Sequence, residues 1–235
     1  MISTLFFDIG ETILNAEAQQ DALAEVHRKV LGDFGFSLTR DEYRRLDEER
    51  IRSFVPSATH AITWHFAKPN LRLHNEITGE LRSHYDEIRQ IGSRLYPGVA
   101  GLLERLADSY ALGLAGNAPA SVTKHLEEFG VLRWFTHTDV SGSIGIKKPD
   151  QRFFETVLTN ADTQASESIM IGDRLDNDII PARRVGMKTI WIRWGRYRIM
   201  EPRTPEEIPD ATVADVREVP AAITSVIATD LNTKS

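Results

Sequence analysis

Short apolar runs recur along the chain and alternate with stretches in which apolar residues are spaced as in helices. The runs end in polar or glycine-containing turns and occupy positions 3–7, 111–115, 168–171 and 189–192. Uninterrupted runs of this length are typical of strands buried on both faces of a parallel sheet. Between the later runs, apolar residues recur at every third or fourth position, as in amphipathic helices that cover a sheet. The alternation predicts an α/β fold with a doubly wound, Rossmann-like parallel sheet.

The segment 16–91 follows a different pattern, with helical spacing and no strand-like run. Within it, Thr39 and Glu42 have the spacing of a capping box, which satisfies the first backbone N–H groups of a helix. Because no strand interrupts this segment, it does not continue the α/β alternation. We therefore expect an all-helical domain at 16–91, inserted into an α/β core formed by 1–15 and 92–235.

Composition and charge narrow the functional classes. The chain is 41% hydrophobic, which is enough apolar material for folded domains. Its net charge of −6 gives no long-range attraction for nucleic acid, and the basic, aromatic stretch 193–198 is interpreted as a surface turn. The chain has no cysteine, which excludes disulfides and thiolate chemistry, and Asp8 interrupts the first apolar run before it could span a membrane. We predict a cytoplasmic protein with a small-molecule substrate and no nucleic-acid or membrane partner, and we leave its oligomeric state open.

Residues that could take part in catalysis or ligand binding occur where the predicted strands end. Asp8 ends the first strand, Gly116 and Asn117 end the second, and Asp173 ends the third. Lys148 lies in a glycine-containing loop between the second and third strands. Ligands of doubly wound sheets bind at the carboxyl ends of the strands. We therefore expect two carboxylates and an ammonium group to meet at one edge of the sheet.

Two neighbouring carboxylates repel each other unless a positive charge neutralises them, and a divalent cation commonly does so in proteins. A site of oxygen ligands with few protein donors suits Mg²⁺, which keeps several waters and accepts a phosphate oxygen. A lysine beside such a site would counter the charge of phosphoryl oxygens and of an anionic nucleophile. These residue types predict phosphoryl chemistry with magnesium as the cofactor.

The order of these motifs resembles that of the haloacid dehalogenase superfamily. Its members have a nucleophilic aspartate after the first strand, a Ser or Thr after the second, a lysine, and an acidic motif containing Gly-Asp. The corresponding residues are Asp8 in FDIGET, Gly116 in AGN, Lys148 in KKP, and Asp173 with Asp178 in GDRLDND. The resemblance covers the core from residue 1 to about residue 192, and the helical insert stands where many members carry a cap domain.

The resemblance implies a role for each of these residues. Asp8 would attack phosphorus and form an aspartyl phosphate, which divides one difficult displacement into two easier steps. Magnesium would be held by the carboxylates of Asp8 and Asp173 and by the backbone carbonyl of Gly10. Lys148 would pair with Asp8 and bind the phosphate, and Asp178 would orient the lysine or a metal-bound water. We therefore expect a magnesium-dependent, phosphatase-type hydrolase that acts on a small phosphorylated metabolite.

Two positions depart from the family pattern. Family members that hydrolyse phosphate esters carry an aspartate as general acid and base where this chain has Gly10, and loss of such catalysis costs about 10²–10⁴ in rate. Gly116 replaces a hydroxyl that would bond to the phosphoryl group, a contact worth roughly 1.5–3 kcal/mol. The Gly116 amide or Asn117 is expected to recover part of this binding. We therefore expect a preference for good leaving groups, such as those of acyl phosphates.

Other residues are candidates for the missing general acid. Glu11 follows Gly10 directly, although our preferred interpretation is that Glu11 caps the turn or faces solvent. The helical insert offers His60, His65, Lys68 and His74, and histidine has a suitable pKa for proton transfer. No role is assigned to any of these four residues.

Gly10 also leaves other functions open. Relatives that cleave carbon–halogen or carbon–phosphorus bonds lack the second aspartate, because their leaving groups need no protonation of that kind. A phosphonatase would need a cap lysine for a Schiff base, for which Lys29 and Lys68 are candidates without further support. Dehalogenases typically lose the acidic motif, whereas Asp173 and Asp178 are present here. A third alternative is a phosphate-binding or regulatory protein with little turnover.

Overall fold

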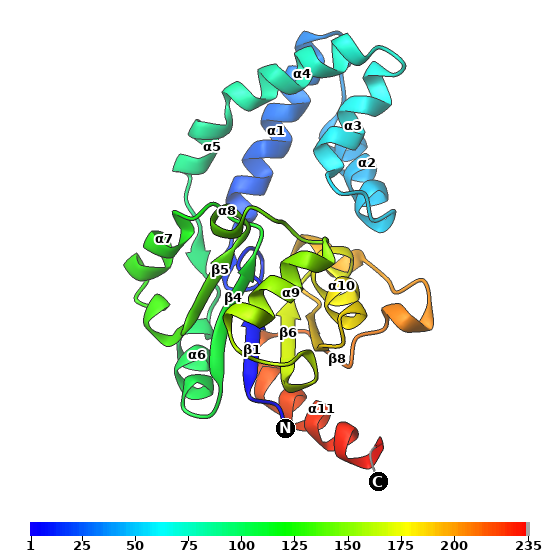
Figure 1. Cartoon of the computed structure of the whole chain (residues 1–235). Helices are drawn as coiled ribbons and strands as arrows, with labels where there is room; N and C mark the ends of the chain where they lie inside the picture. Colours follow the sequence, from blue (N-terminus) through cyan, green and yellow to red (C-terminus); the bar gives the residue numbers. More distant parts are fainter. Residues whose placement is uncertain (234–235) are drawn as a thin grey trace. The chain divides into compact units, whose positions relative to one another are not determined.

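The computed structural model describes residues 1–233, and the chain divides into two compact units (Figure 1). The first, here called the α/β unit, consists of Met1–Asn15 together with the chain from Leu95 onward. The second, the helical unit, consists of Ala16–Arg94. Whether the helical unit acts as a cap stays a prediction.

The α/β unit is built on a parallel sheet, as the sequence predicts. In the described chain this sheet has six strands in the order β5-β4-β1-β6-β7-β8, and every neighbouring pair is parallel. The chain runs from the central β1 outward on one side to β4 and β5, and then continues on the other side from β6 to β8. The switch in strand order therefore lies between β1 and β6, where doubly wound sheets bind ligands. The strands are β1(Thr4–Phe7), β4(Ala111–Gly116), β5(His137–Val140), β6(Ser168–Gly172), β7(Lys188–Ile192) and β8(Ala211–Val213).

Helices cover both faces of this sheet. Side chains alternate between the faces along each strand, so Leu5 and Phe7 of β1 lie in one apolar cluster while Phe6 lies in another. The Leu5 cluster includes residues of α6 and α11, and the Phe6 cluster includes residues of α9 and α10. This burial on both faces explains the unbroken apolar runs. The helices are α6(Val99–Ala107), α7(Val122–Glu128), α8(Ser141–Ile144), α9(Gln151–Asn160), α10(Ile180–Arg184) and α11(Val219–Thr233).

The helical unit contains five helices among the described residues. The capping box at its second helix is confirmed: the Glu42 amide donates to the Thr39 hydroxyl at 3.2 Å, and the Thr39 amide donates to Glu42 Oε2 at 2.8 Å. Two short strands, β2(Leu14–Asn15) and β3(Arg94–Leu95), pair with each other where the chain enters and leaves this unit. None of the described helices combines the length and apolar character needed to span a membrane. The helices are α1(Glu17–Asp33), α2(Arg40–Arg52), α3(Ala58–Ala67), α4(Leu71–Ser83) and α5(Tyr85–Gln90).

His27 is buried within the helical unit and is held by two hydroxyl groups. Its Nε2 lies 2.9 Å from Thr63 Oγ1 and its Nδ1 lies 2.8 Å from the Tyr43 hydroxyl. Thr63 donates its hydroxyl proton to the carbonyl of Thr59, so it accepts from His27, which assigns the proton of the neutral imidazole to Nε2. Burial, and to a smaller extent the charge of His60, lowers the pKa of His27 from 6.5 to about 4.

This lowered pKa predicts that acid destabilises the helical unit. Between about pH 4 and pH 6.5 the unfolded chain binds more protons at His27 than the folded chain, so the free energy of unfolding falls as the pH falls through this window. The loss is about 3 kcal/mol if it is complete. Urea unfolding of the wild type and of His27→Gln at pH 7 and pH 5 measures it. The wild type should lose more stability than the variant, and an equal loss in both would contradict the assignment.

Candidate active site

The first two site residues follow neighbouring strands at the switch in strand order. Phe7 of β1 is paired with Ile171 of β6, and the amide of Asp8 donates to the Ile171 carbonyl at 2.9 Å. Asp173 follows the end of β6, so both carboxylates leave the same edge of the sheet. Both residues are at most 8% exposed. The structure therefore brings together the two carboxylates that the sequence predicts to meet.

Asp178 joins them from a single π-helical turn, η3(Leu175–Ile179), that follows β6. Its Oδ2 accepts a hydrogen bond from the Arg174 amide at 3.0 Å. Gly172 is needed for this approach, because a Cβ at that position would lie 2.6 Å from Asp178 Oδ2 and 2.7 Å from its Cβ. The glycine of the Gly-Asp pair thus makes room for the third carboxylate.

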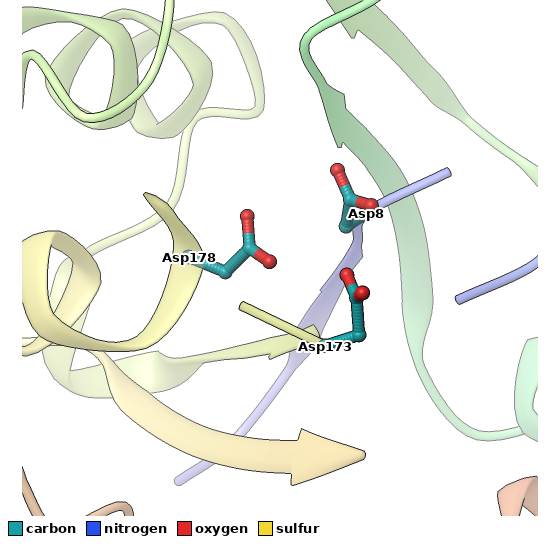
Figure 2. Close-up of side chains that lie close together, drawn as sticks. All are labelled: Asp8, Asp173 and Asp178. Atoms are coloured by element: carbon teal, nitrogen blue, oxygen red, sulfur yellow. The ribbon is translucent and has the colours of Figure 1, made fainter. Parts of the chain in front are cut away.

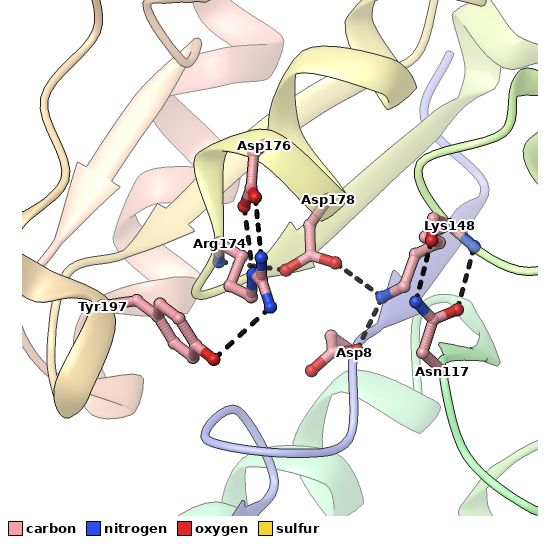
Figure 3. Close-up of polar contacts among 7 residues, drawn as sticks. All are labelled: Asp8, Asn117, Lys148, Arg174, Asp176, Asp178 and Tyr197. Carbon is pink, nitrogen blue, oxygen red and sulfur yellow. Dashed lines mark hydrogen bonds and ion pairs between the residues drawn. The ribbon is translucent and has the colours of Figure 1, made fainter. Parts of the chain in front are cut away.

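Lys148 connects two of the three carboxylates (Figure 3). Its ammonium group donates to Asp8 Oδ1 at 2.6 Å and to Asp178 Oδ1 at 2.5 Å. The backbone of Lys148 is held by the side-chain amide of Asn117, which donates to the Lys148 carbonyl at 2.9 Å and accepts from the Lys148 amide at 2.8 Å. Asn117 therefore positions the lysine, and a contact of this side chain with substrate stays a prediction.

The electrostatics of the site reflect an excess of negative charge. Burial raises the pKa of Asp173 well above its ordinary value, and the charges of Asp8 and Asp178 raise it further. Burial also raises the pKa of Asp178, against the opposing effect of Lys148. For Lys148 burial acts to lower the pKa, but the charges of Asp178 and Asp8 outweigh it and the pKa is raised. One ammonium group thus accompanies three carboxylates, which leaves negative charge in excess.

The donor set fits a magnesium ion. Asp8, Asp173 and Asp178 each offer an oxygen, and these atoms all lie within 4.8 Å of one another (Figure 2). Asp173 Oδ2 is buried and has no hydrogen-bond partner within the described part of the chain. A buried oxygen without a partner costs free energy unless a ligand satisfies it. An all-oxygen cluster with excess negative charge is the kind of site that Mg²⁺ occupies.

Gly10 and Glu11 differ in their surroundings although they are neighbours. Gly10 is exposed, and a Cβ at this position would meet nothing within 4 Å. Glu11 is 4% exposed and accepts a hydrogen bond from the Tyr96 hydroxyl at 2.6 Å, so the expectation that it faces solvent is wrong. The other candidates for the general acid belong to the helical unit: His60 and His65 lie on α3, Lys68 follows α3, and His74 lies on α4.

Gly116 owes its small size to Ile9, the residue after the candidate nucleophile. A Cβ at Gly116 would lie 2.7 Å from Ile9 Cδ1 and 2.9 Å from its Cγ1. The buried Ile9 side chain therefore occupies the space in which a serine or threonine at position 116 would begin. The absence of a hydroxyl at position 116 is therefore explained by the packing of Ile9 against Gly116.

Two residues that support the site were not identified from the sequence. The buried Trp191 donates its indole N–H to the Asp173 carbonyl at 2.8 Å. Arg174 forms a two-bond ion pair with Asp176, at 2.6 and 3.0 Å, and its guanidinium group lies 4.5 Å from the ring centre of Tyr197 (Figure 3). A buried tryptophan needs an acceptor for its N–H, which is the signal that points to Trp191.

Comparison with known protein families agrees with the resemblance that the motifs indicate. The sequence model of the family described as haloacid dehalogenase-like hydrolase matches residues 5–192. The chain belongs to this hydrolase family. The match begins within β1 and ends with β7, so it includes every residue of the candidate site.

Related members of the haloacid dehalogenase-like hydrolase family match this chain over nearly its whole length. A glyceraldehyde 3-phosphate phosphatase of Methanopyrus kandleri is 25% identical over 226 residues, which are 93% of this chain and 96% of the relative. A phosphoglycolate phosphatase of Vibrio cholerae is 26% identical over 225 residues, 92% of this chain and 94% of the relative. The crystal structure of a HAD phosphatase from Thermococcus onnurineus has a TM-score of 0.61 and 24% identity, covering 96% of this chain and 99% of that one, and it shows the shared fold.

The contact between Gly116 and Ile9 predicts that Gly116→Ala destabilises the α/β unit. Overpacking of this kind costs about 1–3 kcal/mol. Urea unfolding measures the cost, which should shrink in an Ile9→Val background because valine lacks the Cδ1 atom. Gly101→Ala is the matched control: its Cβ would meet nothing within 4 Å in the interior of α6, so this variant should be slightly stabilised. An equal cost of Gly116→Ala in both backgrounds would contradict the packing explanation.

Proposed function

We propose that this hydrolase is a magnesium-dependent phosphatase that acts on a small phosphorylated metabolite through an aspartyl phosphate on Asp8. One observation carries the proposal: Lys148 bridges Asp8 and Asp178 beside the buried Asp173 carboxylate, whose Oδ2 has no partner within the described residues. The phosphatase names of the full-length relatives support the same reaction class.

In the proposed reaction, a carboxylate oxygen of Asp8 forms a bond to phosphorus while the bond from phosphorus to the leaving oxygen breaks. The electron pair of the broken bond goes to the leaving group. Water then attacks phosphorus, the bond between Asp8 and phosphorus breaks, phosphate is released, and a water proton passes to solvent or to the phosphate. Asp8 is thereby restored for the next cycle.

The residues of this chain orient and neutralise the reacting groups. Lys148 holds one oxygen of Asp8, which leaves the other oxygen for attack, and its positive charge stabilises the anions around it. We propose that Asp8, Asp173 and the carbonyl of Gly10 hold magnesium. When bound, this ion would supply positive charge for the phosphoryl oxygens. Asp178 accepts a second hydrogen bond from the Lys148 ammonium group and so helps to keep it in place.

Gly10 shapes the substrate preference of the proposed enzyme. Without a carboxylic acid at this position, the leaving oxygen receives no proton from the residue that donates one in related phosphatases. Leaving groups that are already stable as anions, such as the carboxylate of an acyl phosphate, need no such proton. We therefore propose acyl phosphates and other esters with good leaving groups as the preferred substrates.

Dehalogenation receives less support from the geometry. That reaction needs no cation, whereas Asp8, Asp173 and Asp178 bring their oxygens within 4.8 Å of one another. The cost of burying three carboxylates beside one ammonium group is explained by a site built for a cation. A 2-haloacid therefore belongs in the substrate panel as the competing outcome.

The first functional prediction concerns the nucleophile. Purified wild type should release phosphate from acetyl phosphate in the presence of Mg²⁺, and chelation of the metal by EDTA should abolish the release. Asp8→Asn should reduce the rate by on the order of 10³-fold or more, because an amide does not form the covalent intermediate. The measurement is phosphate release across a panel of an acyl phosphate, alkyl phosphates and a 2-haloacid.

Asp41→Asn is the matched control for this experiment, because Asp41 is an exposed residue of α2. It should keep the wild-type rate. Halide release from the 2-haloacid without Mg²⁺ would replace the proposal by dehalogenation. Tight binding of inorganic phosphate without turnover of any panel member would replace it by the binding-protein alternative.

The second functional prediction restores the missing acid. A side chain at position 10 would enter open space without backbone strain, so Gly10→Asp should fold normally. We expect its rate on alkyl phosphates to rise at least tenfold, since positioned acid catalysis contributes about 10²–10⁴. Gly10→Asn has the same shape without the acid and should stay at the wild-type rate. An equal effect of both substitutions would show that the gain does not come from proton transfer.

A further inference from the structure

Glu11 adopts an unusual backbone conformation directly after the nucleophile turn. Its φ angle is +57°, in the left-handed region that glycine occupies without strain. For a residue with a side chain this conformation costs about 1–2 kcal/mol. Glu11 is also 4% exposed, so the chain buries a carboxylate in a strained position. Persistent strain of this kind is maintained when the surrounding structure holds it, and it is found at functional sites.

Two aromatic residues from other parts of the α/β unit hold Glu11. The hydroxyl of Tyr96 donates to Glu11 Oε2 at 2.6 Å, and the indole N–H of Trp194 donates to the Glu11 carbonyl. The two rings stack on each other with centres 4.0 Å apart. Gly195 completes the enclosure, because a Cβ there would lie 2.8 Å from Glu11 Oε2. Tyr96 and Trp194 thus bond to the side chain and to the carbonyl of Glu11, respectively.

The same residue is tied into the backbone of the nucleophile loop, residues 8–14. The Glu11 amide donates to the Leu14 carbonyl at 2.7 Å, and the amides of Ile13 and Leu14 donate to the Ile9 carbonyl at 2.9 and 2.8 Å. Tyr96 also donates its own amide to the Ile13 carbonyl at 3.1 Å. These bonds join the aromatic pair to Glu11 and Ile13, in the middle and the second half of the turn that begins at Asp8.

We propose that Glu11, held by Tyr96 and Trp194, is a positioning residue that fixes the backbone of the nucleophile loop. Its task is to keep Asp8 and the Gly10 backbone in place, so its effect on catalysis rests on the proposed function of Asp8. Its effect on the order of the loop is independent of that function. Glu11 itself makes only structural contacts in this proposal, but it affects catalysis because its loop carries the Asp8 carboxylate.

The test removes the hydroxyl oxygen through which Tyr96 donates a hydrogen bond to Glu11. Tyr96→Phe keeps the ring stack but deletes the donor to Glu11, and hydrogen–deuterium exchange of the peptide that contains residues 8–14 reports the order of the loop. We expect exchange of the Glu11, Ile13 and Leu14 amides to accelerate at least tenfold, with no comparable change elsewhere in the sheet. On acetyl phosphate, kcat should fall at least tenfold while KM changes less than threefold.

Further variants separate positioning from simple stability. Glu11→Gln can still accept from the Tyr96 hydroxyl and should retain slow exchange and most of kcat. Glu11→Gly relieves the left-handed strain but removes the acceptor of the Tyr96 hydroxyl, so kcat should fall at least as far as in Tyr96→Phe without a loss of thermal stability. Adding Tyr96→Phe to Glu11→Gly should cause a smaller loss of kcat than Tyr96→Phe causes alone, because Glu11→Gly has already broken the hydrogen bond between the two residues.

Two matched controls accompany these variants. Tyr110→Phe removes a tyrosine hydroxyl elsewhere in the α/β unit, where the ring packs on the core. Asp162→Gly relieves left-handed strain at a residue with φ +47°, beyond the end of α9. Both controls should leave the exchange of residues 8–14 and kcat unchanged.

The outcomes separate the two proposals. Unchanged exchange of residues 8–14 in Tyr96→Phe would overturn the positioning role, whatever the activity of the variant. Additive losses in the double variant would also overturn it. If the wild type turns over no phosphate at all, the proposed function fails, and the exchange measurements still decide whether Glu11 orders the loop.

Discussion

The ion pairs of Lys148 with Asp8 and Asp178 are the contacts on which the rest of the site depends. Burying such charges costs several kcal/mol for each ion unless their geometry is well satisfied. Much of the local structure provides that geometry: Gly172 lets Asp178 approach, the Arg174 amide holds its second oxygen, and Asn117 holds the lysine backbone. Elements distant in the sequence are thus arranged around a single ammonium group.

These ion pairs do not balance the charge of the site. The single positive charge of Lys148 is shared between Asp8 and Asp178, and Asp173 is left with a raised pKa and an unpartnered oxygen among the described residues. A site designed only for stability would replace such a group by an apolar one, since buried ion pairs are rarely the most stabilising choice. The excess charge is therefore best explained by binding of a cation, which ties the energetics of the fold to the proposed chemistry.

The sequence predicts the centre of the sheet better than its edges. The apolar runs mark β1, β4, β6 and β7 because both faces of these strands are buried. The edge strands β5 and β8 were missed, since half-exposed segments such as HTDV carry no continuous apolar signal. The same limit applies to the helical unit, where the helical spacing of apolar residues continues across 77–88 although α4 ends at Ser83 and α5 begins at Tyr85.

For the site, the sequence motifs predict some of the residues that meet, whereas other contacts depend on tertiary packing. The order of the motifs predicts that Asp8, Lys148 and Asp173 meet, because each follows the carboxyl end of a strand or its loop.

Of the two alternatives for Glu11, a role in the turn or exposure to solvent, only exposure is wrong, because its burial depends on Tyr96 and Trp194, two residues far away in the sequence. Trp194 lies in the basic stretch that was interpreted as a surface turn, yet its ring is stacked and its N–H is bonded. Such contacts arise from the tertiary structure, and no local pattern announces them.

Gly10 and Glu11 together determine whether the loop offers a carboxylic acid for proton transfer. The space beside position 10 is open, but Gly10 has no side chain and therefore places no acid there. Position 11 carries a carboxylate, but Tyr96 engages it and the turn buries it. A buried carboxylate engaged in this way serves the shape of the loop better than the transfer of protons. In the proposed reaction the chemistry of the loop would therefore fall to Asp8, and the leaving group would receive no proton from the two residues that follow Ile9.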